Sequence, residues 1–356
     1  MGLPNPPDRS IFVAPNGRHS VNLANPAVPA YFHISAMRIL SGIQPSGKLH
    51  LGNYFGMMRP AIELQEKGEA LYFIADLHAL TTVQDPVALR EYSRELAVDF
   101  LACGLDPAKA CFFRQSDITA VTELSWILST VTPMGLLERC HSYKDKTARG
   151  FAASHGLFAY PVLMAADILI YDSDLVPVGR DQKQHLEVAR DIAVKINELY
   201  GEVFKLPEPS IREDTATVPG LDGAKMSKSY GNTIGIFEDE KALRKKIMSI
   251  QTDSTPVEAP KPVENSAILG LHKLVAPEAD HAAMVAAFRA GGCGYGDFKR
   301  TLFAAVWEYF APMREKRAAI LADPAFVDGV LREGAARANA IADGVMKRVR
   351  RAVGLA

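Results

Sequence analysis

Apolar and polar segments alternate along residues 37 to 118 in a way that predicts parallel strands joined by helices. Short apolar runs, each read as a strand, occur at "RILSGIQ" (38–44), "ALYFIADLHAL" (70–80) and "ACFFRQSD" (110–117). The segments between them, "GNYFGMMRPAIELQEKG" and "DPVALREYSRELAVDFLACGL", have apolar residues at helical spacing. This order predicts a doubly wound parallel sheet with helices on both faces, whose ligand site lies beyond the carboxyl ends of the strands.

The rest of the chain is predicted to be mainly helical. Residues 119–170 contain two helical patterns, "ELSWILSTV" and "YPVLMAADILIY", and we expect them to form an insertion between the halves of the sheet. A short strand, "DLVPVG", and a helix, "DQKQHLEVARDIAVKINELYG", follow the insertion. Beyond about residue 233 the strand signal ends, and "EDEKALRKKIMSIQ", "FKRTLFAAVWEYFAPMREKRAAILA" and "FVDGVLREGAARANAIADGVMKRVRRAVG" are predicted as amphipathic helices.

Three regions follow from this pattern. Residues 1–36 contain six prolines and few charges and have no periodicity, which predicts a poorly ordered extension. Residues 37–232 are predicted to form a Rossmann-like domain with its helical insertion at about 119–170. Residues 233–356 are predicted to form an all-helical second domain, with the last helix packing back on the first domain.

Composition excludes several classes of protein. A formal net charge of −1 argues against a strongly basic nucleic-acid-binding surface, so any RNA contact is expected to be a local patch. The four cysteines are spaced unlike a zinc site or a disulfide scaffold, and we expect free thiols in a reducing cytoplasm. The sequence has neither an apolar run of membrane-spanning length nor a secretory leader pattern, which predicts a soluble cytoplasmic protein.

The first stretch that carries chemistry is "QPSGKLHLGNYFG", residues 44–56. It places a Gly/Pro/Ser turn after the first predicted strand and His50, Gly52 and Asn53 at the opening of a helix. Unpaired amide groups at such a position favour an anion, and Gly52 allows a flat ligand to approach the backbone. The spacing matches neither the dinucleotide fingerprint nor the Walker loop, so another kind of nucleotide fold is indicated.

A second stretch, "GAKMSKSYGN", lies far downstream and contains Lys225 and Lys228. Two ammonium groups on a mobile loop suit the β- and γ-phosphates of ATP, whose charge shifts during displacement. Taken alone, each stretch is more often an ordinary turn or a solvated loop. Together, at this separation, they resemble the two signatures of the class I aminoacyl-tRNA synthetases.

The central segment, residues 156–193, indicates which amino acid is used. "GLFAYPVLMAADILIYDSDLVPVGRDQKQHLEVARDIA" resembles the corresponding segment of the bacterial-type tryptophanyl enzymes nearly end to end. "DLHALTT" and "HSYKDKTA" extend the resemblance over about residues 37 to 232. A tyrosyl enzyme would be expected to carry a G-G-S-D-Q-W-G-N type of sequence where this chain has "VPVGRDQKQHLE", and that departure favours tryptophan.

The resemblance implies a tryptophan site built around Asp167. Indole presents one N–H donor on a large apolar body, which suits a single carboxylate acceptor among apolar walls. Tyr160, Met164 and Asp167 share one helical face, since they lie at i, i+4 and i+7. A substrate without the donor would leave a buried carboxylate unpaired, which gives strong discrimination. The tryptophan-binding residues expected from the resemblance are Asp167, Tyr160, Met164, Val176, Val178, Gln182 and His78.

The resemblance also assigns the ATP site. The residues expected to bind ATP are Gln44, Pro45, Ser46, Gly52, Asn53, Gly179, Arg180, Asp181, Val218, Lys225, Met226, Ser227, Lys228 and Ser229. Catalysis is assigned to His50, Lys225, Lys228 and Lys146. Their role is to neutralise charge on the pentacoordinate phosphate and the departing pyrophosphate, so no protein nucleophile is needed. Mg²⁺ is expected to be held mainly by phosphates, without a dedicated metal site in the protein.

The function implied is that of a tryptophan–tRNA ligase, which forms tryptophanyl-adenylate from L-tryptophan and ATP and then charges tRNA. The family also implies a homodimer. Basic residues of the helical tail that are candidates for tRNA contact are Arg314, Lys316, Arg317, Lys347, Arg348, Arg350 and Arg351. The alternatives are a tyrosyl-type enzyme, a non-catalytic synthetase-like RNA-binding paralogue, which should have lost His50 or the lysines, and a generic nucleotidylyltransferase.

Overall fold

The computed structural model describes residues 37–140, 144, 148, 150, 154–179, 182–211 and 218–356, with the side chains of 209–211 left out. The extension predicted over residues 1–36 lies outside this part of the chain. None of the helices within it is long and apolar enough to cross a membrane. The four cysteines, Cys103, Cys111, Cys140 and Cys293, are free thiols, as the sequence predicts.

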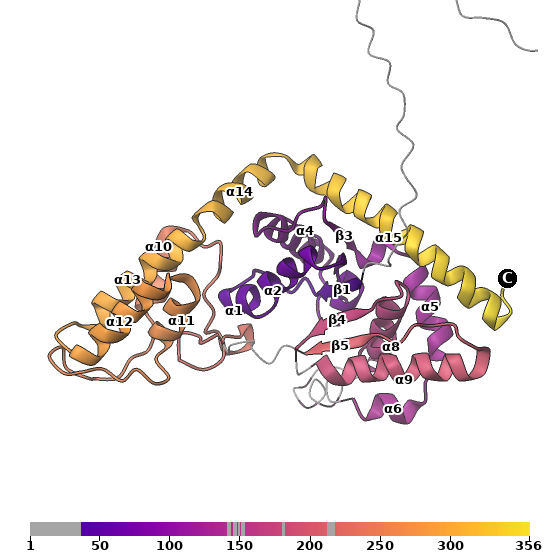
Figure 1. Ribbon diagram of the computed structural model, residues 1–356, viewed down its shortest axis with the longest axis horizontal. Helices are drawn as coiled ribbons and strands as arrows, with labels where there is room; N and C mark the ends of the chain where they lie inside the picture. Colours follow the sequence, from indigo (N-terminus) through magenta and orange to yellow (C-terminus); the bar gives the residue numbers. More distant parts are fainter. Residues whose placement is uncertain are drawn as a thin grey trace, which may run out of the picture. The chain divides into compact units, whose positions relative to one another are not determined.

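The centre of the structure is a parallel sheet whose strand order is β3–β2–β1–β4–β5 (Figure 1). The strands are β1 (Arg38–Ile43), β2 (Glu69–Ile74), β3 (Ala110–Arg114), β4 (Leu175–Val178) and β5 (Glu208–Ile211). The chain winds outward from β1 to β2 and β3, and then crosses to the other side of β1 for β4 and β5. The doubly wound α/β class is therefore confirmed, with the reversal of strand order at β1, where such folds bind ligands.

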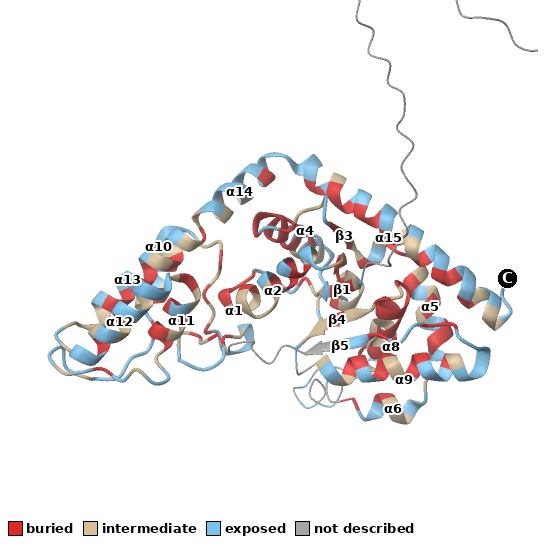
Figure 2. Cartoon of the chain, viewed as in Figure 1, coloured by how far each residue is buried: buried red, intermediate tan, exposed pale blue. Residues whose placement is uncertain are grey.

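Both faces of the sheet are buried, as the apolar strand runs predict. In β2, Tyr72 and Ile74 belong to one hydrophobic cluster, whereas Leu71 and Phe73 belong to another on the opposite face. This alternation follows from the two-residue period of a strand. Figure 2 shows buried residues along the sheet and on the helix faces turned toward it. Parallel sheets need such cover on both sides.

The helices that surround the sheet supply these two layers. The first cluster includes residues of α4, and the second includes residues of α5, α8, α9 and α15. Their bounds are α3 (Asp76–Ala79), α4 (Pro86–Ala102), α5 (Ala120–Ser129), α6 (Met134–Glu138), α8 (His155–Leu169) and α9 (Lys183–Tyr200). Asp85 caps α4 by accepting from the amide of Val87, as its sequence position predicts.

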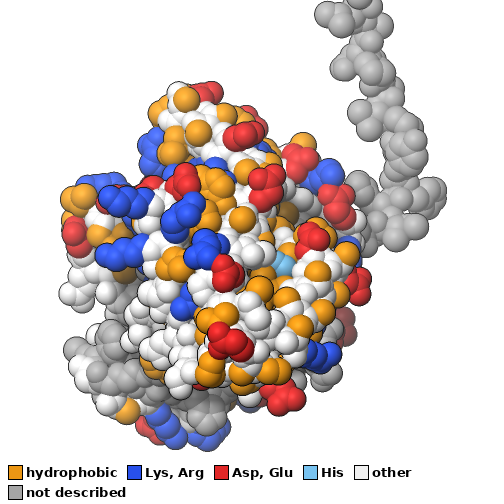
Figure 3. All heavy atoms as spheres, turned by 90° about the vertical axis from the view of Figure 1, so that its left-hand side faces the viewer, with side chains coloured by type: hydrophobic (Ala, Val, Ile, Leu, Met, Phe, Trp, Pro, Cys, Tyr) orange, Lys and Arg blue, Asp and Glu red, His pale blue; other side chains and the backbone are white. Residues whose placement is uncertain are grey.

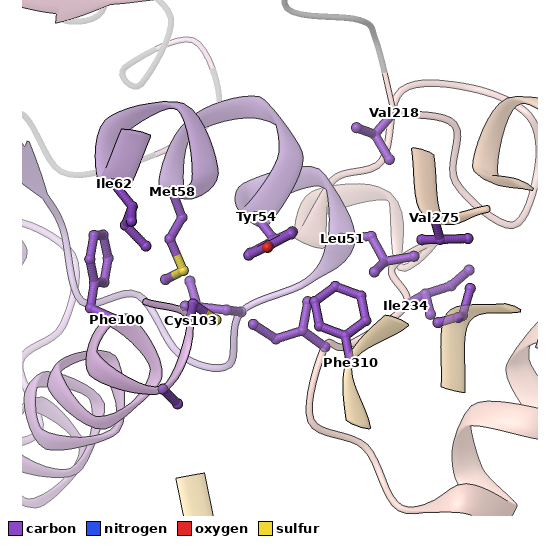
Figure 4. Packing of buried hydrophobic residues seen from close by; sticks show 14 of the residues in the cluster. Leu51, Tyr54, Met58, Ile62, Phe100, Cys103, Val218, Ile234, Val275 and Phe310 are labelled. Carbon is purple, nitrogen blue, oxygen red and sulfur yellow. The ribbon is translucent and has the colours of Figure 1, made fainter. Parts of the chain in front are cut away.

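The helix after β1 is continuous but irregular. It consists of α1 (Leu51–Asn53), a π-helical turn (Tyr54–Met58), α2 (Arg59–Glu63) and a final 3₁₀ turn (Leu64–Glu66). Pro60 has no N–H to donate to the preceding turn, and the wider π-helical turn comes immediately before it. Figure 4 shows Leu51, Tyr54 and Met58 of this helix packed beside Phe100 and Phe310. These side chains join the sheet region to the C-terminal helices through one apolar cluster.

The C-terminal region is helical among its described residues. Its helices are α10 (Glu240–Met248), α11 (Ala267–Val275), α12 (Glu278–Ala290), α13 (Tyr295–Tyr309), α14 (Ala311–Ala322) and α15 (Pro324–Val353). The last of them, α15, packs on β3 and α5. At the crossing, the thiol of Cys111 in β3 donates to the carbonyl of Gly334 in α15, at 3.1 Å.

Three local predictions need correction. The predicted strand 70–80 ends at Ile74 because α3 begins at Asp76, whose carboxylate accepts from the amide and the hydroxyl of Ser116. The predicted helix from Phe298 to Ala322 divides at Phe310, since Pro312 lies in the first turn of a new helix and cannot continue the old one. The sequence pattern did not predict β5, whose prolines are tolerated at the edge of a sheet.

Candidate active site

His50 is fixed at the start of the helix that follows β1. Its Nδ1 accepts from the amide of Asn53, and its own amide donates to Oδ1 of Asn53, which forms a capping box. The backbone on either side of His50 is held by Ile234 and Ile236, because the amide of Leu51 donates to the carbonyl of Ile234 at 2.9 Å. The side chain of His50 is thus held in a nearly closed site, with 6% of the residue exposed.

The structure brings the two predicted signatures together. Lys228 donates from Nζ to the carbonyl of Ser46 at 2.9 Å, and the amide of Gly52 lies 3.4 Å from the sulfur of Met226. The lysine loop therefore closes on the turn and the helix start that the first signature supplies. The ammonium group of Lys228 and the hydroxyl of Ser46 lie within hydrogen-bonding distance of each other there, which is a suitable environment for phosphate.

The local electrostatics favour a neutral imidazole at this position. Burial is the largest cause, and the positive charges of Lys228 and Lys246 add to it, so that the pKa of His50 is lowered to about 4. Burial also lowers the pKa of the Lys228 ammonium. At neutral pH His50 is uncharged, so its polarity, rather than a positive charge, acts on a bound anion.

Asn232 shapes the lysine loop and was not assigned a role from the sequence. It is 3% exposed, accepts from the amide of Ser227 at 2.8 Å, and donates to Asp222 and to the carbonyl of Lys225. Gly220 must be a glycine here, because a Cβ at that position would come within 2.3 Å of the Asn232 amide. The only sequence signal was the Gly-Asn pair that ends "KMSKSYGN".

A cavity of about 400 Å³ opens beside the turn that follows β1. It is lined by every residue predicted to bind tryptophan: His78, Tyr160, Met164, Asp167, Val176, Val178 and Gln182. Gln44 and Gly179, predicted for ATP, line the same cavity. Gln44 follows β1, His78 lies in α3 after β2, and Tyr160, Met164 and Asp167 lie on α8. Val176 and Val178 belong to β4, and Gly179 and Gln182 lie between β4 and α9, so the fold gathers these residues from distant parts of the chain.

Among the described residues that line this cavity, Asp167 is the only carboxylate, and it is 2% exposed. Its Oδ2 lies 2.9 Å from Nε2 of His78, and Nε2 of Gln115 donates to both of its oxygens at 2.8 Å. Burial raises the pKa of the Asp167 carboxyl, while hydrogen bonds and charge from His78 and a hydrogen bond from Gln115 counteract that rise. Gln115 was not selected from the sequence.

The cavity holds a second polar pair, of which Tyr160 was predicted and His185 was not. The hydroxyl of Tyr160 forms a short hydrogen bond with Nε2 of His185, which comes from α9 and also lines the cavity. Gln44 donates to the carbonyl of His78 at 3.3 Å and so connects the turn after β1 to the backbone of α3. His185 lies three residues after Gln182, and its helical pattern gave no indication of its role.

The remaining predicted residues fall into two groups. Pro45 and Val218 are buried, and the carbonyl of Val218 accepts from the amide of Met226 at 2.9 Å. Lys225 is exposed, and the hydroxyls of Ser227 and Ser229 hydrogen-bond to each other at 2.8 Å. Lys146, Arg180 and Asp181 lie outside the described residues, so their predicted roles stay predictions.

A nucleotide-type parallel sheet, a helix start opposite a lysine loop, and an adjoining apolar cavity with one buried carboxylate define the class. The model of the family described as tRNA synthetases class I (W and Y) matches residues 34–311. The chain belongs to this family and is an enzyme.

Within the family, the relatives of high identity are tryptophan–tRNA ligases. The one from Rhodopirellula baltica is 54% identical over 319 residues, which cover 90% of this chain and all of the relative. The one from Fusobacterium nucleatum is 52% identical and covers 89% of this chain. The chain is a member of the bacterial tryptophan–tRNA ligases of this family.

Solved structures agree with this placement. The tryptophanyl-tRNA synthetase of Campylobacter jejuni, complexed with ADP and tryptophan, is 51% identical, with a TM-score of 0.86 over 90% of this chain and all of that chain. A tyrosyl-tRNA synthetase from Archaeoglobus fulgidus, at 22% identity and a TM-score of 0.61, shares the fold alone.

Proposed function

We propose that this enzyme activates L-tryptophan with ATP, releases pyrophosphate, and transfers tryptophan from the adenylate to the terminal adenosine of its tRNA. The observation that carries the proposal is Asp167, a buried carboxylate and the only one among the described residues that line the cavity of about 400 Å³ beside the turn after β1. A carboxylate acceptor beside apolar side chains such as Met164 and Val176 matches an indole ring, which has one N–H donor on an apolar body. The Campylobacter jejuni relative binds ADP and tryptophan together.

Catalysis in this proposal is positioning and charge neutralisation. The tryptophan carboxylate attacks the α-phosphorus of ATP, and the bond to pyrophosphate breaks in line with it. Lys228 lies against Ser46 of the turn after β1, so its ammonium group faces the place where negative charge develops. His50, held neutral, hydrogen-bonds to the reacting phosphate, and Lys225 and Lys146 follow the leaving group.

We assign the remaining ATP contacts to the turn Gln44–Ser46, the helix start at Gly52 and Asn53, and the segment Gly179–Asp181. Mg²⁺ is assigned mainly to the phosphates and water, because the part of the chain that the structure describes holds no cluster of three or more His, Cys, Asp or Glu side chains that could bind a metal ion. Bound there, the ion would neutralise charge on the β- and γ-phosphates.

The proposal includes tRNA as partner, a homodimer as working form and the cytoplasm as location, all from family resemblance. It also includes the three regions 1–36, 37–232 and 233–356, with tRNA and its anticodon bound by the last. Three of the basic tail residues have acidic partners inside the molecule: Arg317 pairs with Glu95 and Asp99, Arg348 with Asp172, and Arg350 with Glu123. Lys316, Lys347 and Arg351 are exposed and remain the better candidates for RNA contact.

The test is pyrophosphate exchange measured with each of the twenty amino acids. Tryptophan should support exchange, and phenylalanine should support it about 10⁴-fold less well, because it leaves Asp167 unpaired. Asp167→Ala should lower kcat/KM for tryptophan, with a loss of a few kcal/mol in transition-state stabilisation. It should leave the KM for ATP close to that of the wild type. Exchange driven by tyrosine, or wild-type use of tryptophan by Asp167→Ala, would contradict the proposal.

A further inference from the structure

Gln115 occupies a fully enclosed position directly after β3. It is 0% exposed, and every polar atom of its side chain has a partner. Its Oε1 accepts from the amides of Leu77 and His78 at 3.1 and 3.3 Å, and its Nε2 donates to both oxygens of Asp167 at 2.8 Å. The two backbone donors fix the amide orientation, because an inverted amide would place N–H against N–H.

The hydrogen bonds around Asp167 leave room for one more donor. A carboxylate has about four acceptor positions. Gln115 uses one position on each oxygen, and His78 uses a second position on Oδ2. One acceptor position is left on Oδ1, in a residue that lines the cavity.

We propose that Gln115 is a positioning residue for substrate selection, which holds the Asp167 carboxylate so that one oxygen stays open to an indole N–H. The inference rests on the proposed function, because it deepens the role given there to Asp167. Gln115 itself does not line the cavity, so it acts through Asp167 and through the backbone of His78. The same amide thereby places two of the predicted tryptophan contacts.

A second consequence concerns protonation. Hydrogen-bond donors around a buried carboxylate favour its ionised form. Protonation would turn one of its acceptor oxygens into a donor. The charged and titratable groups that surround Asp167 are His78 and Asp76 of α3 and Tyr171 beyond the end of α8. Tyr160 and His185 are hydrogen-bonded to each other nearby, and the centre of the Tyr160 ring lies 6.2 Å from that of the His78 ring. Gln115 is the uncharged donor in this group.

Two variants separate positioning from packing. Gln115→Glu keeps an oxygen for the amides of Leu77 and His78 but replaces the donor to Asp167 with a second acid. Gln115→Met removes the donor without adding charge, although it leaves those two amides without their glutamine partner. We expect both to raise the KM for tryptophan on the order of tenfold to a hundredfold, with the KM for ATP unchanged. In the plot of kcat/KM for tryptophan against pH, the acidic limb should move to higher pH in Gln115→Met, because Asp167 loses a hydrogen-bond donor that favours its ionised form.

The control is Asp167→Asn, alone and combined with Gln115→Glu. If Gln115 acts through Asp167, the second change should add little to the first. A wild-type KM and pH profile in Gln115→Glu, with tryptophan use impaired in Asp167→Asn, overturns the positioning role and leaves the proposed function standing. Normal tryptophan use by Asp167→Asn would instead defeat the site assignment itself. Equal rises in both KM values with a lower melting temperature would mean that Gln115 is merely structural.

Discussion

His50 combines two roles that the structure ties to one conformation. It caps the helix after β1 through Asn53, and it lies close enough to Lys228 and Lys246 for their charges to depress its pKa. Burial is the larger cause of that shift. The residue that caps this helix therefore also makes the folded state sensitive to acid.

The pKa of His50 predicts how stability changes with pH. It is about 4 in the folded protein and about 6.5 when unfolded, so the unfolded state binds more protons between these values. Stability is then present above about pH 6.5 and is lost as pH falls toward 4. The variant His50→Asn can still cap the helix. We expect its melting temperature to fall less than that of the wild type when the pH is lowered from 7.5 to 5. Parallel curves for the two proteins would be inconsistent with a depressed pKa at His50.

Lys228 provides the second test at the residue scale. Its ammonium group contacts the turn after β1, where the proposed mechanism places the charge that develops in the transition state. We therefore expect Lys228→Ala to lower kcat by about 10²- to 10³-fold, with a much smaller change in the KM for ATP. Steady-state exchange kinetics measure both constants. Lys245→Ala, an exposed lysine on α10, is the matched control and should behave like the wild type. A change confined to the KM for ATP would mean that the loop only holds the ground state.

At the scale of elements, the contact between α15 and β3 depends on one glycine. A Cβ added to Gly334 would lie 1.9 Å from the carbonyl oxygen of Phe112 and 2.6 Å from its carbon. Backbone cannot yield as a side chain can, so the close approach of helix and strand requires the absence of a side chain. Farther along the helix, Arg348 donates to the carbonyl of Val203 and pairs with Asp172, which holds α15 near β4 and α9 as well.

Gly334→Ala should therefore destabilise the protein by about 3 kcal/mol, although alanine is the better helix former. Gly344→Ala in the same helix is the matched control, since a Cβ there would meet nothing within 4 Å. The free energy of unfolding of Gly344→Ala should rise by up to about 1 kcal/mol. Urea denaturation of the two variants measures both free energies of unfolding. Equal effects would show that helix propensity, and not the crossing with β3, governs position 334.

At the scale of the whole molecule, acidic and basic side chains are interspersed, in keeping with a formal net charge of −1. Figure 3 shows this mixture on one face, with Lys and Arg side chains grouped toward one side of it. Several basic residues are used inside the molecule, as when Arg317 of α14 pairs with Glu95 and Asp99 of α4. Charge therefore joins the C-terminal helices to the sheet region as well as marking the surface.

The limits of the folded unit give the last prediction. Met37 is the first residue that the structure describes, and its carbonyl accepts from the amide of Glu69 at 3.0 Å, next to the pairing of β1 with β2. The family match begins at residue 34, and the full length of the Rhodopirellula baltica relative covers 90% of this chain. We expect a chain that begins at Met37 to keep the melting temperature and exchange activity of the full chain. A drop of many degrees, or loss of exchange, would place part of residues 1–36 in the fold.

The sequence by itself determined the type of most elements and the identity of the signatures. Periodicity is a local property, so β1, α4 and α8 could be predicted from runs of neighbouring residues. The two signatures and the tryptophan segment could be read for the same reason, since each is contiguous. Where the local pattern carries no strand signal, as in the proline-containing edge strand β5, no element was predicted.

Only the tertiary structure decided which distant residues meet. Gln115 and Asp167 are 52 positions apart, and Ser46 and Lys228 are 182 apart, yet each pair is in hydrogen-bonding contact. Their meeting depends on strand order, because parallel strands bring their carboxyl ends to one edge of the sheet. The pKa of His50 and the glycine requirement at position 334 likewise come from burial and close approach. No local pattern contains those quantities, since they are set by the parts of the chain that fold against each residue.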